Sequence, residues 1–238
     1  MSKRANSEPK TPATDEESAL RRPPQQARGE RRVAGLLDAA AAVIAEVGVA
    51  AASAEAIARR AGTAKGSLYQ FFPNADAIVS ALAARYATEL ATVYAASFGA
   101  AEAAATVPEL VDRVLEPLAA FHDRNPAFRH VFEVARQARD EDGTGRLVGR
   151  LRLTVVERIE RLLQQLDPQL AEAERRRHAR VVQTMGQALL YLRAESPIDE
   201  RPEMLRAVRD ALVRYLSGVI TTGEGRPRRR GSVRSLAP

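Results

Sequence analysis

The sequence predicts an all-α protein, and three observations lead to this fold class. Apolar residues recur at helical spacing over most of the chain, whereas runs with the alternation typical of strands are few. The 238 residues are 45% hydrophobic and 28% charged, which is ordinary for a globular protein with a sizeable core. Proline and glycine residues divide the chain into about nine helical segments. We expect a small N-terminal head of three helices followed by a larger helical body.

The first helix of the head is expected over Arg31–Val47, where Gly48 ends it. One face of this segment is apolar at helical spacing, which favours an amphipathic helix packed on a core. The apolar positions are Leu36, Leu37, Ala40, Val43, Ile44 and Val47.

Residues 53–74 have the pattern of a helix-turn-helix. Ser53 is a good N-cap because its hydroxyl can accept from a free backbone N–H of the next turn. Ile57 and Ala61 then fall on one face of a two-turn helix. Gly62 adopts the left-handed conformation without steric cost and ends that helix.

A second short helix is expected over Ala64–Phe72, with Leu68 and Phe72 directed back onto the first. The opposite side of this segment is rich in hydrogen-bond donors, as is typical of a helix that enters a major groove. The donors are Lys65, Ser67, Tyr69 and Gln70. The segment therefore predicts binding to duplex DNA.

Six further helices are expected in the body, separated by Pro73-Asn74, Asn125-Pro126 and the charged turn at 140–145. Proline at position 108 is tolerated in a first helical turn, whereas Pro117 is expected to kink its helix. The expected helices are Asp76–Phe98, Pro108–Asp123, Ala127–Arg139, Arg146–Leu166, Pro168–Glu195 and Asp199–Thr222.

The formal net charge of +6 lies mostly at the two ends of the chain. Residues 1–32 carry eight Lys and Arg against five Asp and Glu, and residues 223–238 carry five Arg against one Glu. Both ends are rich in Pro, Gly or Ser, so we expect a disordered basic arm over 1–27 and a disordered Arg-rich tail over 223–238. Attraction to phosphate and simple solvation of the chain ends both remain open as their roles.

The absence of cysteine excludes disulfides and thiolate metal sites and fits a reducing compartment. Residues 1–32 contain no apolar core of a secretory signal. The Ala-rich run 36–58 carries Asp38, Glu46 and Glu55, which excludes a membrane span there. We expect a cytoplasmic protein that does not associate with membranes.

The string IARRAGTAKGSLYQFFPN at residues 57–74 resembles the tetracycline-repressor (TetR) family of bacterial transcription regulators, whose pattern reads IA-x-x-AGV-S/A-KG-S/T-LY-x-x-F. Residues 36–78 carry the match, and beyond Ala91 the likeness is one of helix number and length. The resemblance implies a DNA-binding head over 28–74 and an effector-binding and dimerisation domain over 75–222. It further implies a homodimeric repressor, without cofactor, that a small-molecule effector of unknown identity releases from a palindromic operator in double-stranded DNA.

The resemblance also implies DNA-contacting roles for particular residues. Lys65, Ser67 and Gln70 would face base edges or phosphates, Gly66 would allow close approach to the groove, and Tyr69 would contact phosphate. The complete implied set is Arg28, Arg31, Arg32, Ser53, Thr63, Ala64, Lys65, Gly66, Ser67, Tyr69, Gln70 and Phe71.

Three positions depart from the family pattern. Ala75 stands in place of a phosphate-clamping lysine, Phe71 in place of a His or Tyr, and Ala64 in place of a capping serine. Thr63 is expected to cap the second helix one residue earlier instead. We expect somewhat weaker DNA binding, or compensation by the arginines near the N-terminus.

A small number of polar groups on or beside apolar helix faces are candidates for an effector pocket. Each of them can equally be a satisfied core or surface residue, and we expect no metal site. The candidates are His122, His130, Arg136, Gln183, Gln187 and Tyr191.

Two other functional classes compete with a ligand-responsive repressor. A DNA-binding protein without small-molecule control, regulated by a partner or acting as an architectural factor, remains the alternative. An all-α enzyme is not expected, because the chain has no paired-histidine metal motif, no glycine-rich phosphate loop and no cysteine nucleophile.

Overall fold

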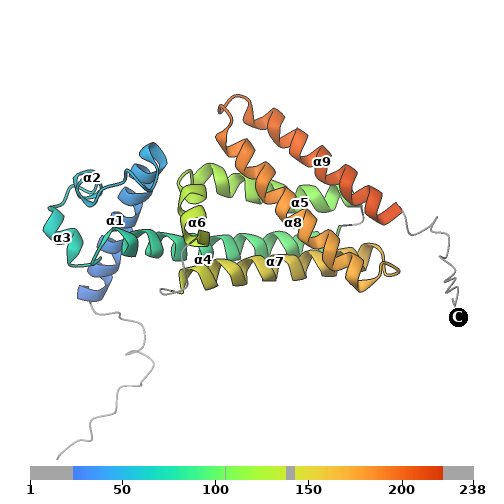
Figure 1. The fold of residues 1–238 in the computed structure, drawn as a ribbon, viewed down its shortest axis with the longest axis horizontal. Coiled ribbons are helices and arrows are strands. Elements are labelled where there is room, and N and C mark those ends of the chain that lie inside the picture. Colours follow the sequence, from blue (N-terminus) through green and yellow to red (C-terminus); the bar gives the residue numbers. More distant parts are fainter. Residues whose placement is uncertain (1–23, 105, 138–142, 222–238) are drawn as a thin grey trace, which may run out of the picture.

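The computed structural model describes residues 24–104, 106–137 and 143–221, and the regular elements in these ranges are nine α-helices without a strand. Figure 1 shows a small head formed by α1 to α3 at one end and a body formed by the remaining helices. The predicted all-α fold is confirmed. The N-terminal arm up to residue 23 and the C-terminal tail from residue 222 lie outside the described residues.

The head consists of α1 (Pro24–Val47), α2 (Ala54–Arg60) and α3 (Lys65–Tyr69). The predicted end of the first helix is confirmed, but its predicted start at Arg31 is wrong because α1 begins at Pro24. The last four residues assigned to the basic arm are therefore helical. A proline suggests a break in the sequence, yet a proline in the first helical turn costs no hydrogen bond and has a helical φ already.

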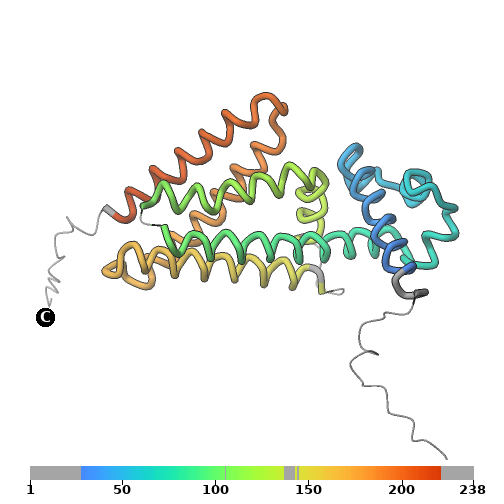
Figure 2. The backbone as a smooth tube through the Cα atoms, turned by 180° about the vertical axis from the view of Figure 1, so that it is seen from behind, coloured from blue at the N-terminus to red at the C-terminus, as the bar shows by residue number. Residues whose placement is uncertain are grey.

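Helix α4 (Ala75–Ala101) joins the two parts of the molecule. Asn74 begins it as the N-cap, and its side-chain oxygen accepts a 2.8 Å hydrogen bond from the Ala77 N–H. The helix packs against α1 in the head and against α5 and α7 in the body. Figure 2 shows it running without interruption from one part to the other. Helix α4 therefore connects the head and the body directly.

Five helices complete the body around α4. The α8 helix starts four residues later than the predicted Pro168, because Asp167 forms a turn in which its carboxylate accepts from the Gln169 N–H at 3.0 Å. Pro117 lies inside α5, which continues on both sides of it. The five helices are α5 (Val107–Arg124), α6 (Phe128–Gln137), α7 (Thr144–Leu166), α8 (Glu172–Glu195) and α9 (Arg201–Thr221).

One contiguous set of buried apolar residues runs through head and body, from Leu36 on α1 to Leu216 on α9. At its centre Tyr86, Phe121 and Phe128 pack edge to face, with ring centroids 4.9–6.5 Å apart. Within the described part of the chain, no helix is long and apolar enough to cross a membrane.

Candidate nucleic-acid interface and ligand cavity

The helix-turn-helix is held by short-range contacts that its sequence encodes. Ser53 accepts a 3.1 Å hydrogen bond from the Ala56 N–H at the start of α2. Gly62 has a φ of +63°, the left-handed conformation expected at the end of that helix. Ile57 and Leu68 are buried with 2% and 0% exposure and pack α2 and α3 on the common core. The turn therefore presents α3 at a fixed angle to the rest of the head.

The outer face of α3 is polar and open. Lys65, Tyr69 and Gln70 are exposed, and the Lys65 ammonium lies 5.9 Å from the centroid of the Tyr69 ring. Ser67 is half-buried. A Cβ added at Gly66 would meet no atom within 4 Å, so the backbone is accessible from outside at this point. This face can approach the floor of a DNA groove closely.

The other residues predicted to contact DNA surround this face. Arg28 and Arg31 are exposed on α1, and Phe71 is half-buried. The predicted capping role of Thr63 is wrong: Ala64 is the N-cap of α3 and makes no side-chain cap, and the Thr63 hydroxyl instead accepts from the Arg32 guanidinium at 2.9 Å. The turn thereby ties α1 to the start of α3.

Two ion pairs brace the head. The Arg60 guanidinium lies 2.6 Å from the Glu46 carboxylate, and this hydrogen bond holds the pKa of Glu46 below its ordinary value. Arg85 on α4 donates to Asp38 on α1 at 2.6 Å. Arg60 therefore joins α2 to α1.

The body encloses a cavity of about 310 Å³, which is at the small end of the range for small-molecule sites. Helices α4 to α9 all contribute to its wall, and most of the lining side chains are apolar or aromatic. The polar lining residues are Tyr94, His122, Arg136, Arg152, Gln183, Gln187 and Tyr191.

Five of the six predicted pocket residues line this cavity, and His130 does not. The lining residues of α6 are Phe128, Phe132 and Arg136, each four positions from the next and hence on one face. His130 lies two positions from Phe128, on the opposite side of the helix, and is exposed. Tyr94 and Arg152 were missed by the sequence reasoning, although both lie among apolar lining residues of their own helices.

Four polar side chains form a continuous chain of hydrogen bonds along one wall of the cavity. The Arg152 Nε–H donates to Gln183 Oε1 at 3.0 Å, Gln183 Nε2 donates to Gln187 Oε1 at 3.1 Å, and Gln187 Nε2 donates to the Tyr191 hydroxyl at 3.0 Å. Residues 183, 187 and 191 are spaced by four on α8, which aligns them on one face of that helix.

His122 is buried at the same end of the cavity, with 8% exposure. Its ring packs edge to face against Phe128 and Tyr191, with centroids 5.1 and 5.5 Å away. Burial and, to a lesser extent, the charge of Arg193 lower the pKa of His122 to about 4, against the opposing effect of Asp123. The imidazole is therefore neutral at neutral pH.

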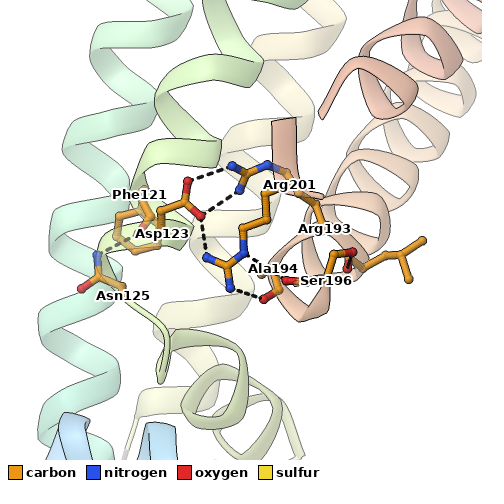
Figure 3. A network of polar contacts seen from close by, with 8 residues as sticks. Phe121, Asp123, Asn125, Arg193, Ala194, Ser196 and Arg201 are labelled. Atoms are coloured by element: carbon orange, nitrogen blue, oxygen red, sulfur yellow. Dashed lines mark hydrogen bonds and ion pairs between the residues drawn. The ribbon is translucent and has the colours of Figure 1, made fainter. Parts of the chain in front are cut away.

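The next residue along the chain, Asp123, joins the end of α5 to α8 and α9, as Figure 3 shows. It accepts two hydrogen bonds from Arg193, at 2.8 and 3.0 Å, and one from Arg201 at 3.0 Å. The Arg193 hydrogen bonds hold the pKa of Asp123 below its ordinary value. Arg193 is buried with 5% exposure, a position that nothing in the local sequence pattern indicated. This network holds the C-terminal end of α5 against the junction between α8 and α9.

A helix-turn-helix with an open, donor-bearing face, carried on a helical body, defines the class of DNA-binding transcription regulators. Residues 36–82 match the family described as bacterial regulatory proteins, tetR family, and residues 106–216 match the tetracyclin repressor-like C-terminal domain. The chain belongs to the tetracycline-repressor family of DNA-binding transcription regulators. No curated protein matches the sequence.

Solved structures of such regulators have the same fold. A transcriptional regulator from Pseudomonas aeruginosa PAO1 superposes with a TM-score of 0.63 at 18% identity, covering 81% of this chain and 92% of its own. A TetR-like regulator from Rhodococcus sp. RHA1 gives 0.58 at 22% identity, covering 78% and 93%. PfmR, a TetR-family regulator from Thermus thermophilus, gives 0.57 at 23% identity, covering 75% and 97%.

Proposed function

We propose that this protein is a homodimeric repressor that binds a palindromic operator and is released from it by a small-molecule effector bound in the body cavity. The observation that carries the proposal is the combination of an open polar face on α3 with a largely apolar cavity in the same chain. The head, from Arg28 to Asn74, reads the operator, and residues 75–222 bind the effector and the second subunit.

The operator is read by α3. Lys65 and Gln70 supply donors to base edges, Tyr69 donates to a phosphate, and Gly66 permits close approach of the backbone. Arg28, Arg31 and Arg32 extend this surface along α1 toward the flanking phosphates.

The second subunit is bound by an apolar stripe on the outside of α8. Val181, Met185, Ala188 and Leu192 repeat at intervals of three and four residues, which places them on one side of the helix. Val181 and Leu192 are 39% and 49% exposed. The cavity-lining residues of α8 lie on its opposite side, so one helix borders both the ligand and the partner.

The effect of the bound ligand is transmitted to the head through α4 and α6. Both helices line the cavity, and both pack against α1. A ligand that favours one arrangement of these helices shifts the separation of the two recognition helices in the dimer. A coupling of about 1–3 kcal/mol suffices for a fivefold to hundredfold change in operator affinity.

Selection of bound duplexes from a random pool by the full-length protein tests this proposal. We expect an enriched palindrome with half-sites about 34 Å apart, one turn of the duplex. Gln70→Ala should relax the selection at one base pair per half-site, whereas Tyr69→Phe should weaken binding to all sequences alike. Binding that salt abolishes and that enriches no sequence would reject the proposal in favour of a non-specific DNA-binding protein.

A further inference from the structure

The hydrogen-bond chain along α8 has only one possible direction. Arg152 begins it and can only donate, so Gln183 must present its oxygen to Arg152 and its amide nitrogen to Gln187. Gln187 must in turn present its oxygen to Gln183 and its nitrogen to Tyr191. Turning either amide over would set donor against donor, which fixes the sense of all three bonds.

The consequence is that the Tyr191 hydroxyl oxygen already accepts a hydrogen bond and still has its own proton to donate. Among the described residues, no hydrogen bond uses this proton, and Tyr191 lines the cavity. Burial raises the pKa of Tyr191, so the hydroxyl keeps its proton at neutral pH. A donor thus faces a largely apolar space, where an unused polar group is unfavourable until an acceptor arrives.

The charges near Tyr191 are balanced. Arg136 pairs with Glu133 at 2.7 Å, and Arg129 pairs with Glu195. Both arginines and Glu133 act on the hydroxyl electrostatically, and each cation has its own carboxylate partner. Arg152, the lining cation that donates to Gln183 and Thr184, joins α8 about two helical turns away from Tyr191. A ligand carboxylate held at Tyr191 would therefore meet only cations that are already paired, and its burial would be costly.

The histidine beside Tyr191 adds no charge to this end of the cavity. The neutral His122 ring packs against Tyr191, and the nearby cation Arg193 is paired with Asp123. A ligand ammonium would bring up to three donors toward a hydroxyl whose oxygen already accepts one hydrogen bond, and toward the nearby Arg193 cation. An uncharged hydrogen-bond acceptor can use the Tyr191 proton without either of these penalties.

We propose that the cavity selects an uncharged, mostly apolar small molecule bearing a carbonyl oxygen, of the ketone, ester or lactone class, and that the Tyr191 hydroxyl donates to that oxygen. The inference rests on the proposed function, which makes this cavity the effector site, and adds the chemical class of the effector. Tyr191 thereby becomes a specificity-determining residue.

Four probes on a common phenylalkyl frame test the inference: benzylacetone, butylbenzene, phenylbutyrate and phenylbutylamine. Their affinities for the full-length protein are measured by displacement of a fluorescent apolar dye. Benzylacetone should bind about three- to tenfold more tightly than butylbenzene, the contribution of one neutral hydrogen bond, and more tightly than the acid or the amine. Tyr191→Phe should remove the ketone's advantage and leave butylbenzene binding unchanged. Tyr215→Phe, a hydrogen-bonded tyrosine outside the cavity lining, is the matched control and should retain the advantage.

Two substitutions at Gln187 separate proton direction from mere structure. In Gln187→Glu the carboxylate can only accept hydrogen bonds, so the Tyr191 hydroxyl donates to it instead of to the ligand. The ketone's advantage is then lost although the tyrosine is still present. Gln187→Met breaks the chain but leaves that proton free, so the advantage remains. Thermal unfolding confirms that each variant is folded.

The inference is overturned if phenylbutyrate binds as tightly as benzylacetone, if Tyr191→Phe or Gln187→Glu keeps the ketone's advantage, or if no probe displaces the dye. Release of operator DNA is measured separately on the same samples. A ketone that binds through Tyr191 without releasing DNA supports this inference and contradicts effector control, so the two failures are distinguishable.

Discussion

The head and the body use polar residues in opposite ways. On the outer face of α3, Lys65, Tyr69 and Gln70 are exposed and bear little of the fold, whose packing there depends on Leu68 beneath them. In the body, Arg193 and His122 are buried among helices that only the tertiary structure brings together. Changes on the surface of the head should therefore alter DNA binding without altering stability, whereas changes to the polar groups of the body should alter stability first.

The largest effect is expected from removing the carboxylate that the body's arginines share. Asp123→Ala leaves the buried Arg193 guanidinium without its counter-ion, and Arg193 Nε already lacks a partner among the described residues. An uncompensated buried charge costs several kcal/mol, so we expect the free energy of unfolding to fall by about 3 kcal/mol. Urea denaturation followed by circular dichroism measures it.

Arg193→Met is the matched control for that change, since it removes the buried cation and leaves Asp123 to Arg201. The remaining Asp123 carboxylate is 38% exposed and keeps Arg201, so no unpaired charge is left buried and we expect a loss of about 1 kcal/mol or less. Equal losses in the two variants would show that the network is a packing feature rather than a compensated buried charge.

An intermediate effect is expected from pH, through His122. Between pH 6.5 and about 4 the unfolded imidazole binds a proton that the folded one, with its pKa lowered to about 4, does not. The unfolded state then holds more protons, so the stability present above pH 6.5 is lost as the pH falls through this window. We expect the loss to be on the order of 2 kcal/mol.

His122→Phe should flatten this part of the stability curve, because phenylalanine fits the surrounding aromatic rings and does not titrate. The head offers the contrast, since α1 to α3 contain no histidine. An unchanged slope in His122→Phe, measured by unfolding at pH 7 and pH 5, would assign the pH dependence to other groups.

The same contrast explains what the sequence could predict. The head is encoded by local sequence. Within one short segment Ser53 predicts a helix cap, Gly62 a turn and Leu68 a core position, and all three predictions are confirmed. Helix number and most helix ends were likewise readable from periodicity. Two predicted starts are wrong: α1 begins seven residues before the predicted Arg31, and α8 begins at Glu172 rather than at Pro168.

The cavity could be predicted only in part, because its walls come from six helices spread along the chain. Residues 183, 187 and 191 were found because they share one face of one helix. Arg152 and Tyr94 were missed because their proximity to that face depends on how α7 and α4 pack against α8, which no local pattern specifies. The predicted DNA-contacting residues stay predictions until an operator is in hand.

The smallest effect on stability is expected at Gly66, and the sharpest contrast comes from comparing it with Gly62. Gly66→Ala adds a methyl group where nothing lies within 4 Å, inside a helix that alanine favours by up to about 1 kcal/mol, so stability should be unchanged or slightly higher. If the α3 backbone approaches the groove closely, the same methyl group should weaken operator binding about tenfold, equivalent to about 1.4 kcal/mol.

Gly62→Ala is the matched control. Because Gly62 has a φ of +63°, alanine there should lower the stability by about 1–2 kcal/mol, whether or not this residue lies near DNA. Thermal unfolding and fluorescence anisotropy with the selected operator measure both properties for each variant. Full operator affinity in Gly66→Ala would place the α3 backbone away from the groove floor. Side chains alone would then bridge the gap to DNA, and the long donors Lys65 and Gln70 would become the main readers of sequence.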